Sequence, residues 1–347
     1  MAIIGVKDAL ESDDIVFIDV RSPKEYNEGC IPGAINIPIF DDEERKIIGF
    51  LYHNVGKEEA KEEGLKIATR KLSDIYEKLK GIGLDKKIVI YCWRGGMRSQ
   101  SLVTVFRMLG KNVYQLEGGY KAYRKYVLSE IEKAEKKNFK FVVLHGYTGT
   151  GKTEILNILK EKGYPVLDLE KLANSRGSVF GSVGLGRPYS QKTFESLLVE
   201  ELKKIEEDYL IVESESKRVG DVILPKFISE GIYSGTHILV TASLENRIKR
   251  ILCEYIKYYD INIDEEIRNC INAVRRYIGN KKTDEILRYF DMGDYRRVIE
   301  ELLINYYDPT YRHSINRYQY SLQVNSDEME EAISEIEGFL KKFKESS

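Results

Sequence analysis

Short apolar runs alternate with amphipathic stretches along most of the chain. Runs rich in valine, isoleucine, leucine and aromatic residues predict buried strands. We expect such strands at residues 15–18, 87–90, 113–116, 139–145, 164–167, 209–212, 238–240 and 318–324. Between them, apolar residues recurring every three or four positions predict helices at 24–27, 65–80, 101–109, 154–161 and 328–343. This alternation predicts an α/β fold with mainly parallel sheets.

The same pattern divides the chain into two domains. The charged stretch 129–138 has few apolar residues and predicts a solvated linker between a domain at 1–128 and a second at 139–347. Residues 41–64 are charged and interrupted by glycines, so we expect an irregular segment there. From about 244 to 317 the pattern becomes helical, and one apolar stripe consists of Leu244, Ile248, Ile251, Leu252, Tyr255 and Tyr259. The second domain should therefore carry a helical extension.

Charge and cysteine content exclude several classes of protein. The 54 lysines and arginines against 56 aspartates and glutamates give a net charge of −2, so any RNA contact must come from local clusters. The four cysteines at 30, 92, 253 and 270 form no CxxC pair, which predicts neither a disulfide framework nor a dedicated metal site. Since we see no signal peptide and no apolar run of about 20 residues, we expect a cytoplasmic protein with no membrane partner.

The first candidate site is a loop that begins at Cys92, directly after the strand 87–90. The residues that follow are Trp93, Arg94, Gly95, Gly96, Met97 and Arg98. The glycines allow the backbone to curl, and the helix behind the loop directs its positive end and backbone N–H groups toward the sulfur. Together with the two arginines, this favours the thiolate, so Cys92 is predicted to be a nucleophile. The loop alone is compatible with sulfur transfer, arsenate reduction or phosphatase chemistry.

The second candidate site is a GxxxxGK[ST] sequence between a predicted strand and a predicted helix. Its phosphate-binding residues are expected to be Gly146, Thr148, Gly149, Thr150, Gly151, Lys152 and Thr153. Such a loop presents backbone N–H groups to phosphate oxygens. Lys152 is expected to reach the terminal phosphates, and the Thr153 hydroxyl to bind Mg²⁺.

Carboxylates follow two further predicted strands of the second domain. Asp168 ends one strand, and Glu213 and Glu215 follow another. Side chains just past parallel strands lie on the ligand side of an open α/β sheet, so these three are candidates to hold a metal ion or a water. The alternative for Glu213 and Glu215 is an ordinary solvated strand end. A long glycine-rich loop at 174–188 contains Arg176, a candidate contact for an anion.

The helical extension combines basic side chains with tyrosines. Arg247, Lys249, Arg250 and Lys257 are expected on the polar face opposite the apolar stripe, with Tyr258 among the interleaved tyrosines. Candidate RNA contacts are Arg275, Arg276, Tyr311 and Arg312. Basic groups can contact phosphates while aromatic rings stack on unpaired bases. The alternative is a solvated helical face, since acidic residues are also frequent here.

Residues 1 to about 125 resemble a rhodanese domain. The resemblance rests on residues 19–26 (DVRSPKEY), the segment 29–38 (GCIPGAINIP), the Cys92-x-x-Gly95-x-x-Arg98 loop and residues 117–119 (EGG). It implies that Cys92 carries a persulfide stabilised by its backbone cradle. Cys30 stands where the family usually has histidine, and we expect it to pack rather than react. Asp19 and Arg21 are expected to form a structural pair.

The whole chain, with a rhodanese domain joined to a phosphate loop, is similar to the tRNA 2-selenouridine synthases. Further shared residues are Arg176 to Ser178, Ser190 and Gln191, Phe194 and Glu195, residues 213–216 and residues 307–309. The resemblance implies replacement of sulfur by selenium in wobble-position 2-thiouridine, with S-geranylation as an intermediate step. It implies selenophosphate and geranyl diphosphate as co-substrates, and the tRNA anticodon region as a partner. A selenophosphate-supplying enzyme is a further possible partner, and use of Mg²⁺ and of ATP or GTP stays open.

Two other functions remain compatible with the sequence. One is an ATP-dependent sulfurtransferase or small-molecule kinase with a rhodanese partner domain, which ATP turnover coupled to product would reveal. The other is a non-catalytic RNA-binding or regulatory protein, against which persulfide formation on Cys92 would count.

Overall fold

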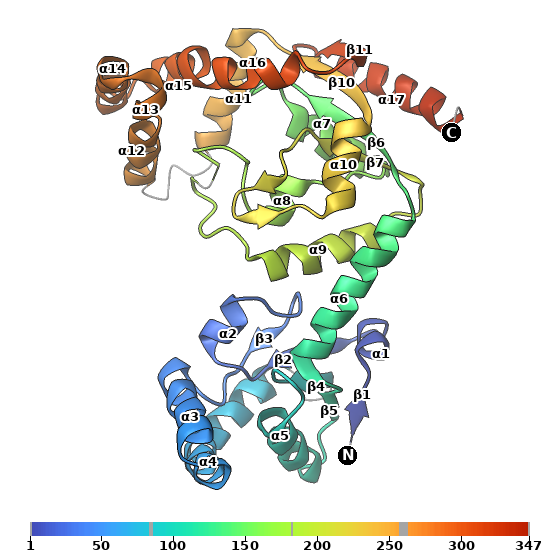
Figure 1. Cartoon of the computed structure of the whole chain (residues 1–347), viewed down its shortest axis with the longest axis vertical. Helices are drawn as coiled ribbons and strands as arrows, with labels where there is room; N and C mark the ends of the chain where they lie inside the picture. The colour runs from blue at the N-terminus through green and yellow to red at the C-terminus, as the bar shows by residue number, and fades with distance from the viewer. Residues whose placement is uncertain (1, 83–85, 182, 257–262, 346–347) are drawn as a thin grey trace. The chain divides into compact units, whose positions relative to one another are not determined.

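The computed structural model describes residues 2–82, 86–181, 183–256 and 263–345, which form two compact units (Figure 1). Unit 1 contains residues 1–134 together with 190–200, and unit 2 contains 135–189 and 201–347. The predicted linker is largely helical, because the helix α6 (Gly119–Lys136) continues through most of it. Among the described residues, no helix is both long and apolar enough to cross a bilayer.

Unit 1 is built on a parallel sheet with helices on both faces. Its strands are β1 (Ile3–Ile4), β2 (Ile15–Asp19), β3 (Ile35–Asn36), β4 (Lys87–Tyr91) and β5 (Val113–Leu116). They pair in the order β1-β5-β4-β2-β3, and every pairing is parallel. The helices are α1 (Val6–Leu10), α2 (Pro23–Asn27), α3 (Asp42–Asn54), α4 (Lys57–Ile82), α5 (Met97–Met108) and α6.

The sequence of the central strand β4 is apolar because its side chains pack in two cores, one on each face of the sheet. Side chains alternate between the two faces of a strand. Ile88 and Ile90 pack in one core with residues of α4 and α5. Val89 and Tyr91 pack in the other core with residues of α1 and α6. Because helices cover both faces, all four side chains are fully buried, as expected for a central parallel strand.

Unit 2 contains a second parallel sheet. Its strands, β6 (Lys140–His145), β7 (Tyr209–Glu213), β10 (Thr236–Thr241) and β11 (Tyr320–Asn325), pair in the order β11-β10-β6-β7. A small antiparallel pair joins β8 (Arg218–Val219) to β9 (Val222–Ile223). Helices α7 (Lys152–Glu161), α8 (Leu169–Ala173), α10 (Lys226–Ser234) and α17 (Met329–Glu345) accompany the sheet, and α9 (Gln191–Lys203) crosses from unit 1 into unit 2.

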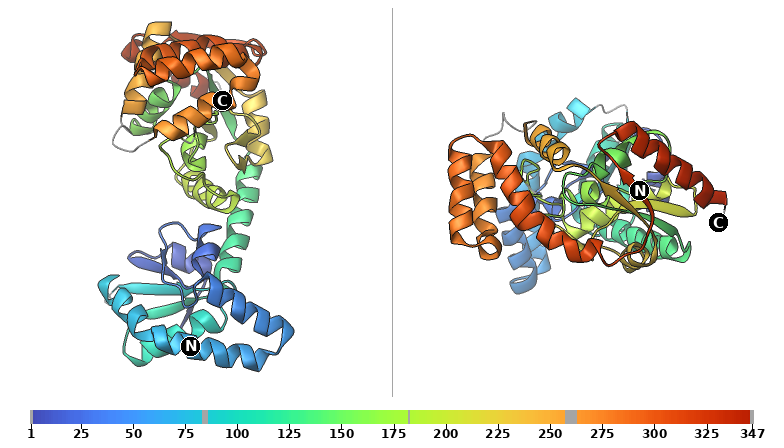
Figure 2. Two further views of the ribbon diagram at one scale, coloured as in Figure 1. Left: turned by 90° about the vertical axis from the view of Figure 1, so that its left-hand side faces the viewer. Right: turned by 90° about the horizontal axis from the view of Figure 1, so that it is seen from above.

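The expected helical extension forms its own core beside this sheet (Figure 2). It consists of α11 (Leu244–Ile256), α12 (Asp264–Ala273), α13 (Arg275–Ile278), α14 (Asn280–Asp291), α15 (Tyr295–Leu302), the π-helix η1 (Leu303–Tyr307) and α16 (Asp308–Ile315). Of the apolar stripe predicted from Leu244, Ile248 is buried and Leu244, Ile251 and Leu252 are half-buried in this core. Lys257, Tyr258 and Tyr259 lie outside the described residues.

The α/β class predicted from the sequence is confirmed, with two local corrections. Residues 41–64 are not irregular, because α3 and the first turns of α4 occupy them and a capping box between Asp41 and Glu44 starts α3. The predicted strand 164–167 is reduced to a single bridge between Val166 and Ile211. Pro165 has no N–H to donate, so a regular ladder cannot extend through this segment.

Candidate active sites

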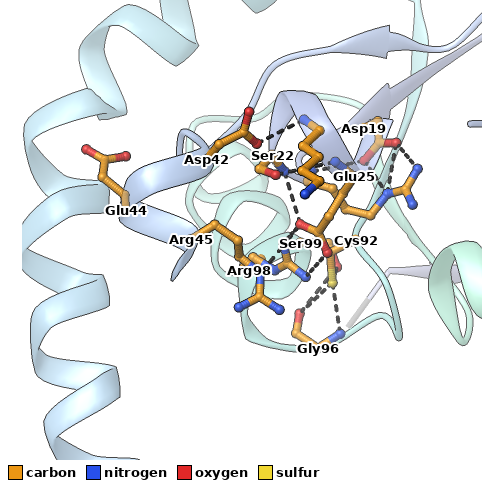
Figure 3. A network of polar contacts seen from close by, with 12 residues as sticks. Asp19, Ser22, Glu25, Asp42, Glu44, Arg45, Cys92, Gly96, Arg98 and Ser99 are labelled. Carbon is orange, nitrogen blue, oxygen red and sulfur yellow. Dashed lines mark hydrogen bonds and ion pairs between the residues drawn. The ribbon is translucent and has the colours of Figure 1, made fainter. Parts of the chain in front are cut away.

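The Cys92 sulfur is surrounded by hydrogen-bond donors. Cys92 follows β4 and is 3% exposed. The Gly96 N–H and the Ser99 hydroxyl each donate to Sγ at 3.3 Å (Figure 3). Gln115 Nε2 donates to the Ser99 oxygen at 2.9 Å, and the Ser99 hydroxyl has two acceptors, the sulfur and the Gly96 carbonyl at 3.2 Å. Donors directed at one atom stabilise negative charge on it, so the loop suits an anionic sulfur or selenium.

Glycines allow the Cys92 loop to pack against the start of α6. A side chain on Gly119 would place its Cβ 2.3 Å from the Cys92 carbonyl oxygen, and Gly119 has φ +61°. Gly95 has φ +65° and lies against the backbone of Gly118 and Gly119. The Tyr120 N–H donates to the Cys92 oxygen at 2.9 Å, which fixes the loop to the helix. The backbone here approaches too closely for any other residue.

The two arginines of the loop differ in their surroundings. Arg98 forms an ion pair with Glu25, with 2.7 Å between Nη1 and Oε2, so its charge is neutralised (Figure 3). Burial opposes ionisation of Glu25, but the hydrogen bond and charge of Arg98 outweigh it and lower the pKa of that carboxyl. Arg94 and Met97 are exposed, and Trp93 is half-buried against the Tyr120 ring. The positive contribution near the sulfur therefore comes mainly from backbone N–H groups and the helix end.

Asp19 and Arg21 form the expected structural pair. Both are buried, and the Arg21 side chain donates to both Asp19 carboxylate oxygens and to the Gly29 carbonyl. The guanidinium also lies 3.9 Å from the centre of the Tyr120 ring. Cys30 is half-buried, and burial raises the pKa of its thiol. This favours the neutral, unreactive form and agrees with a packing role.

In unit 2, the GxxxxGK[ST] sequence forms a phosphate loop between β6 and α7. Gly146, Gly149 and Gly151 have φ values of +158°, +81° and +80°, which other residues rarely adopt. The Lys152 ammonium donates back to the Gly146 carbonyl at 3.1 Å, so it lies over the loop. The loop leads directly into α7, whose first N–H groups have no partner within the helix. This is a ready-made site for phosphate.

Three glutamates gather beside this loop. The carboxylate oxygens of Glu170, Glu213 and Glu215 lie within 4.8 Å of one another, and the Thr153 hydroxyl donates to Glu213 at 2.8 Å. Burial, together with the charge of Glu213, raises the pKa of Glu170 to about 10 and that of Glu215 to about 7. Burial also raises the pKa of Glu213. We call these residues the carboxylate trio.

The sequence analysis identified two of the three residues of the carboxylate trio. It selected Glu213, Glu215 and Thr153, but it chose Asp168 and missed Glu170. The Asp168 carboxylate accepts the Lys171 N–H at 2.9 Å and caps α8, outside the trio. Because Asp168 is the cap, Glu170 falls in the first turn of α8. The cap pattern of an aspartate before a short helix was the signal that could have identified Glu170.

Two segments distant in sequence cover the trio. Gly177 has φ +67°, and a Cβ there would lie 3.1 Å from oxygens of both Glu170 and Glu215. Tyr311 of α16 is half-buried, and burial followed by the charges of Glu215 and Glu170 raises the pKa of its phenol. Arg176 forms an ion pair with Glu254 at 2.8 Å and also donates to the Val183 carbonyl. The glycine-rich loop and the helical extension therefore both contribute to this site.

The candidate RNA contacts are spread over the helical extension. Arg275 forms an ion pair with Asp284 at 2.8 Å, Arg276 lies over the Tyr277 ring, and Arg312 is exposed. The prediction that Arg247 lies on a polar outer face is wrong, because its side chain is 5% exposed. Its Nε donates to the Thr148 carbonyl and its other nitrogens to Asp308. The sequence pattern alone does not distinguish an arginine that donates to buried acceptors from an arginine on the surface, which is why the prediction for Arg247 was wrong.

Comparison with known proteins agrees with this two-site architecture. Residues 5–126 match the model of the rhodanese-like domain, and residues 139–342 match that of the tRNA 2-selenouridine synthase AAA domain. A tRNA 2-selenouridine synthase from Sulfurovum sp. (strain NBC37-1) is 31% identical over 94% of each chain. Another from Nitrosomonas europaea is 36% identical over 82% of this chain and 74% of its own.

Among solved structures, the N-terminal domain of a protein described as ATP/GTP binding, from Clostridium difficile 630, is 48% identical. That match covers 37% of this chain and 99% of the other, with a TM-score of 0.36. The two family models span most of the chain, and the relatives are similar to it over most of its length. The chain belongs to the tRNA 2-selenouridine synthase family.

Proposed function

We propose that this enzyme replaces the sulfur of wobble-position 2-thiouridine in tRNA by selenium, in two steps served by its two sites. The observation that carries the proposal is the presence, in one chain, of a donor-rich cysteine loop and a phosphate loop. The relatives of near full length, which bear the name tRNA 2-selenouridine synthase, support the same pairing. The proposed tRNA substrate places the reaction in the cytoplasm.

The first step would take place at the phosphate loop. The thiocarbonyl sulfur of 2-thiouridine attacks the first carbon of geranyl diphosphate, so a carbon–sulfur bond forms and the carbon–oxygen bond breaks. Pyrophosphate leaves with the electron pair, and the N3 proton of the base is released to solvent, to be taken up again when the 2-selenouridine forms. The loop N–H groups and Lys152 would bind this leaving group and stabilise its growing charge. A diphosphate is sufficient for these contacts, and no nucleotide is required.

The carboxylate trio has the chemistry of a magnesium site. All its donors are oxygens, and the Thr153 hydroxyl lies beside Glu213. Hard divalent cations prefer such ligands. Thr153 and Glu213 would hold Mg²⁺, with Glu215 and Glu170 near it, and the bound ion would supply positive charge next to the diphosphate. Without the ion, the raised pKa values of Glu170 and Glu215 indicate that the trio retains protons at neutral pH.

The second step would use the Cys92 loop. The selenium of selenophosphate attacks C2 of the S-geranylated base, a carbon–selenium bond forms, and geranylthiolate leaves with the electrons of the carbon–sulfur bond. Water then cleaves the phosphorus–selenium bond and releases phosphate. Geranylation makes the sulfur a competent leaving group. Cys92 would act in this step, where the donors around its sulfur can stabilise an anionic chalcogen.

The proposed tRNA would contact the helical extension, where Arg275, Arg276, Tyr311 and Arg312 are the candidate residues. Arg276 and Arg312 are exposed, whereas Arg275 is already paired with Asp284. Tyr311 is half-buried, and burial followed by the charges of Glu215 and Glu170 raises the pKa of its phenol, so contact with the phosphate site is a second candidate role for it. An enzyme that makes selenophosphate is the proposed supplier of the second co-substrate.

Mass analysis of the wobble nucleoside tests the proposal. The enzyme is incubated with 2-thiouridine tRNA, geranyl diphosphate and selenophosphate, and each component is omitted in turn. We expect S-geranyl-2-thiouridine when selenophosphate is missing and 2-selenouridine only when all are present. Persistence of 2-thiouridine under all conditions, or its conversion only with ATP, would contradict the proposal.

Variants assign the steps to the sites. Lys152→Ala should abolish geranylation but still convert pre-geranylated tRNA to 2-selenouridine. Cys92→Ser should accumulate the geranylated nucleoside. Lys160→Ala, in the same helix as Lys152 and paired with Glu201 on the surface, is the matched control and should act as wild type. Cys253→Ser, at an exposed cysteine, serves the same purpose for Cys92.

A further inference from the structure

Two arginines of α11 hold the phosphate loop from outside. Arg247 Nε donates to the Thr148 carbonyl at 2.8 Å. Arg250 donates to the Ser326 side chain at 3.1 Å, and the Ser326 hydroxyl donates to the Thr150 carbonyl at 2.7 Å. Arg247 and Ser326 are buried, so these contacts are shielded from water. The carbonyls of Thr148 and Thr150 are therefore held by side chains that lie outside the GxxxxGK[ST] sequence.

The direction of these carbonyls determines the direction of the N–H groups. A trans peptide is planar, and its C=O and N–H point to opposite sides. When the Thr148 carbonyl points to Arg247, the N–H of Gly149 must point the other way. The same relation holds for the Thr150 carbonyl and the N–H of Gly151. Holding these carbonyls thus keeps the Gly149 N–H directed away from Arg247 and the Gly151 N–H directed away from Ser326, and it fixes the N–H directions that an anion-binding loop requires.

Arg247 depends in turn on Asp308. The Arg247 nitrogens Nη1 and Nη2 donate to the two Asp308 oxygens at 3.0 and 2.6 Å, a bidentate pair. A buried guanidinium without this partner would be strongly destabilised. Asp308 is the first residue of α16 and directly follows the π-helix η1. π-Helical turns are rare and frequently occur at functional sites.

The loop also packs directly on α11. A Cβ on Gly149 would lie 3.0 Å from both the Arg247 carbonyl oxygen and Ile251 Cδ1. A Cβ on Gly151 would lie 3.2 Å from the Arg250 guanidinium carbon and 3.0 Å from Met329 Cε. The loop and the helix are therefore in direct contact, and the Arg247 side chain is bonded to the backbone next to Gly149.

We propose that Arg247 and Asp308 are positioning residues that hold the phosphate loop in its diphosphate-binding conformation. This inference rests on the proposed function of the loop. It adds two residues outside the GxxxxGK[ST] sequence to the phosphate site, and it gives the pair in α11 and α16 a role other than RNA binding. The pair depends on its bidentate geometry, which a lysine or an amide cannot reproduce.

Kinetics of geranylation test the inference with Arg247→Lys and Asp308→Asn. Each variant should raise the KM for geranyl diphosphate and the Kd for inorganic pyrophosphate at least tenfold. The KM for tRNA should stay within about twofold, and the kcat should fall less than the KM rises. Asp308→Glu retains the carboxylate and should recover most of the affinity. Breaking this buried pair lowers the melting temperature in either case, but a purely structural pair would change the KM for tRNA and the KM for geranyl diphosphate equally.

A second ion pair on α11 supplies the matched control. Arg296 Nη1 donates to Glu245 at 2.7 Å and joins α15 to α11, but both side chains are exposed and neither contacts the phosphate loop. Arg296→Lys and Glu245→Gln should leave both KM values unchanged. Unchanged geranyl diphosphate affinity in Arg247→Lys and Asp308→Asn would overturn the inference, provided that Lys152→Ala abolishes binding. If Lys152→Ala also binds normally, the proposed function of the loop fails instead.

Discussion

The Ser99 hydroxyl is the side-chain donor to the Cys92 sulfur, and its removal is a direct test of the cradle. Ser99 is fully buried, and Gln115 fixes the orientation of its hydroxyl. One hydrogen bond of about 1 kcal/mol corresponds to roughly a fivefold change in rate. We expect Ser99→Ala to slow iodoacetamide alkylation of Cys92 by about this factor, measured by mass spectrometry of the Cys92 peptide. Exposed Cys253 supplies the internal control, and equal slowing at both cysteines would contradict the prediction.

His145, immediately before the phosphate loop, is expected to make the stability of the protein depend on acid pH. Its Nε2 lies 2.9 Å from His237 Nδ1, and burial, followed by the charges of His237 and Lys152, lowers the pKa of His145 to about 3. Below the ordinary pKa of 6.5, His145 is protonated in the unfolded chain but stays neutral in the folded chain. The free energy of unfolding should therefore fall by up to about 1.4 kcal/mol per pH unit between pH 6.5 and 3.

Nuclear magnetic resonance of the imidazole protons measures this directly. The chain has four histidines, and exposed His53 and His313 provide comparison signals. The His145 signal, assigned with His145→Gln, should not move between pH 8 and 5. A titration of His145 with a midpoint above pH 5 would contradict the low pKa.

At the scale of elements, hydrophobic patterns in the sequence predicted the strands, turns and helices that adjacent residues largely determine. The strand–loop–helix units around Cys92 and Lys152 followed from apolar runs and glycines, because those local patterns indicate where a strand ends and a turn begins. Residues 41–64 were misjudged because single glycines in a charged stretch resemble breaks, yet Gly49 lies inside α3 and Gly64 inside α4. Both helices are stabilised by packing on each other and on the sheet, which the local sequence does not reveal.

The glycine-rich loop provides an internally controlled test of its own role. Gly177 and Gly186 have similar φ values of +67° and +72°, so alanine strains both backbones by about 1 kcal/mol. Only Gly177 lies against the trio, because a Cβ on Gly186 would meet nothing within 4 Å. We expect Gly177→Ala to reduce kcat/KM for geranylation more than tenfold and Gly186→Ala by less than about twofold. Equal losses would mean that the loop matters only through its backbone.

At the scale of the whole molecule, the sequence predicted two domains and one site in each. It could not predict which side chains from distant segments complete a site. Glu170, Gly177 and Tyr311 meet beside Glu215 only because α8, the glycine-rich loop and α16 fold to one edge of the sheet. The same limit applies to Arg247, whose partner Asp308 lies 61 residues away. Contacts between side chains that are distant in sequence depend on tertiary packing, whereas composition and motif spacing give information only on residues that are close in sequence.

Residues 190–200 belong to unit 1, although they follow the phosphate loop of unit 2 in sequence. Val199 is 4% exposed and packs in the core with Val89, Tyr120 and Tyr123. Ser190 donates to the Glu28 carbonyl at 2.8 Å, and Arg124 forms an ion pair with Glu195. This eleven-residue segment therefore completes the fold of unit 1 even though it follows the phosphate loop in sequence.

Val199→Asp should consequently destabilise unit 1, because it buries a charge without a partner in an apolar core. We expect a loss of about 3 kcal/mol or more in the free energy of unfolding. Trp93, the single tryptophan of the chain, lies against Tyr120 in the same core and reports on this unit by fluorescence during urea unfolding. Leu65→Asp, at a side chain 65% exposed in α4, is the control and should shift the transition little. An unchanged Trp93 transition in Val199→Asp would show that unit 1 folds without this segment.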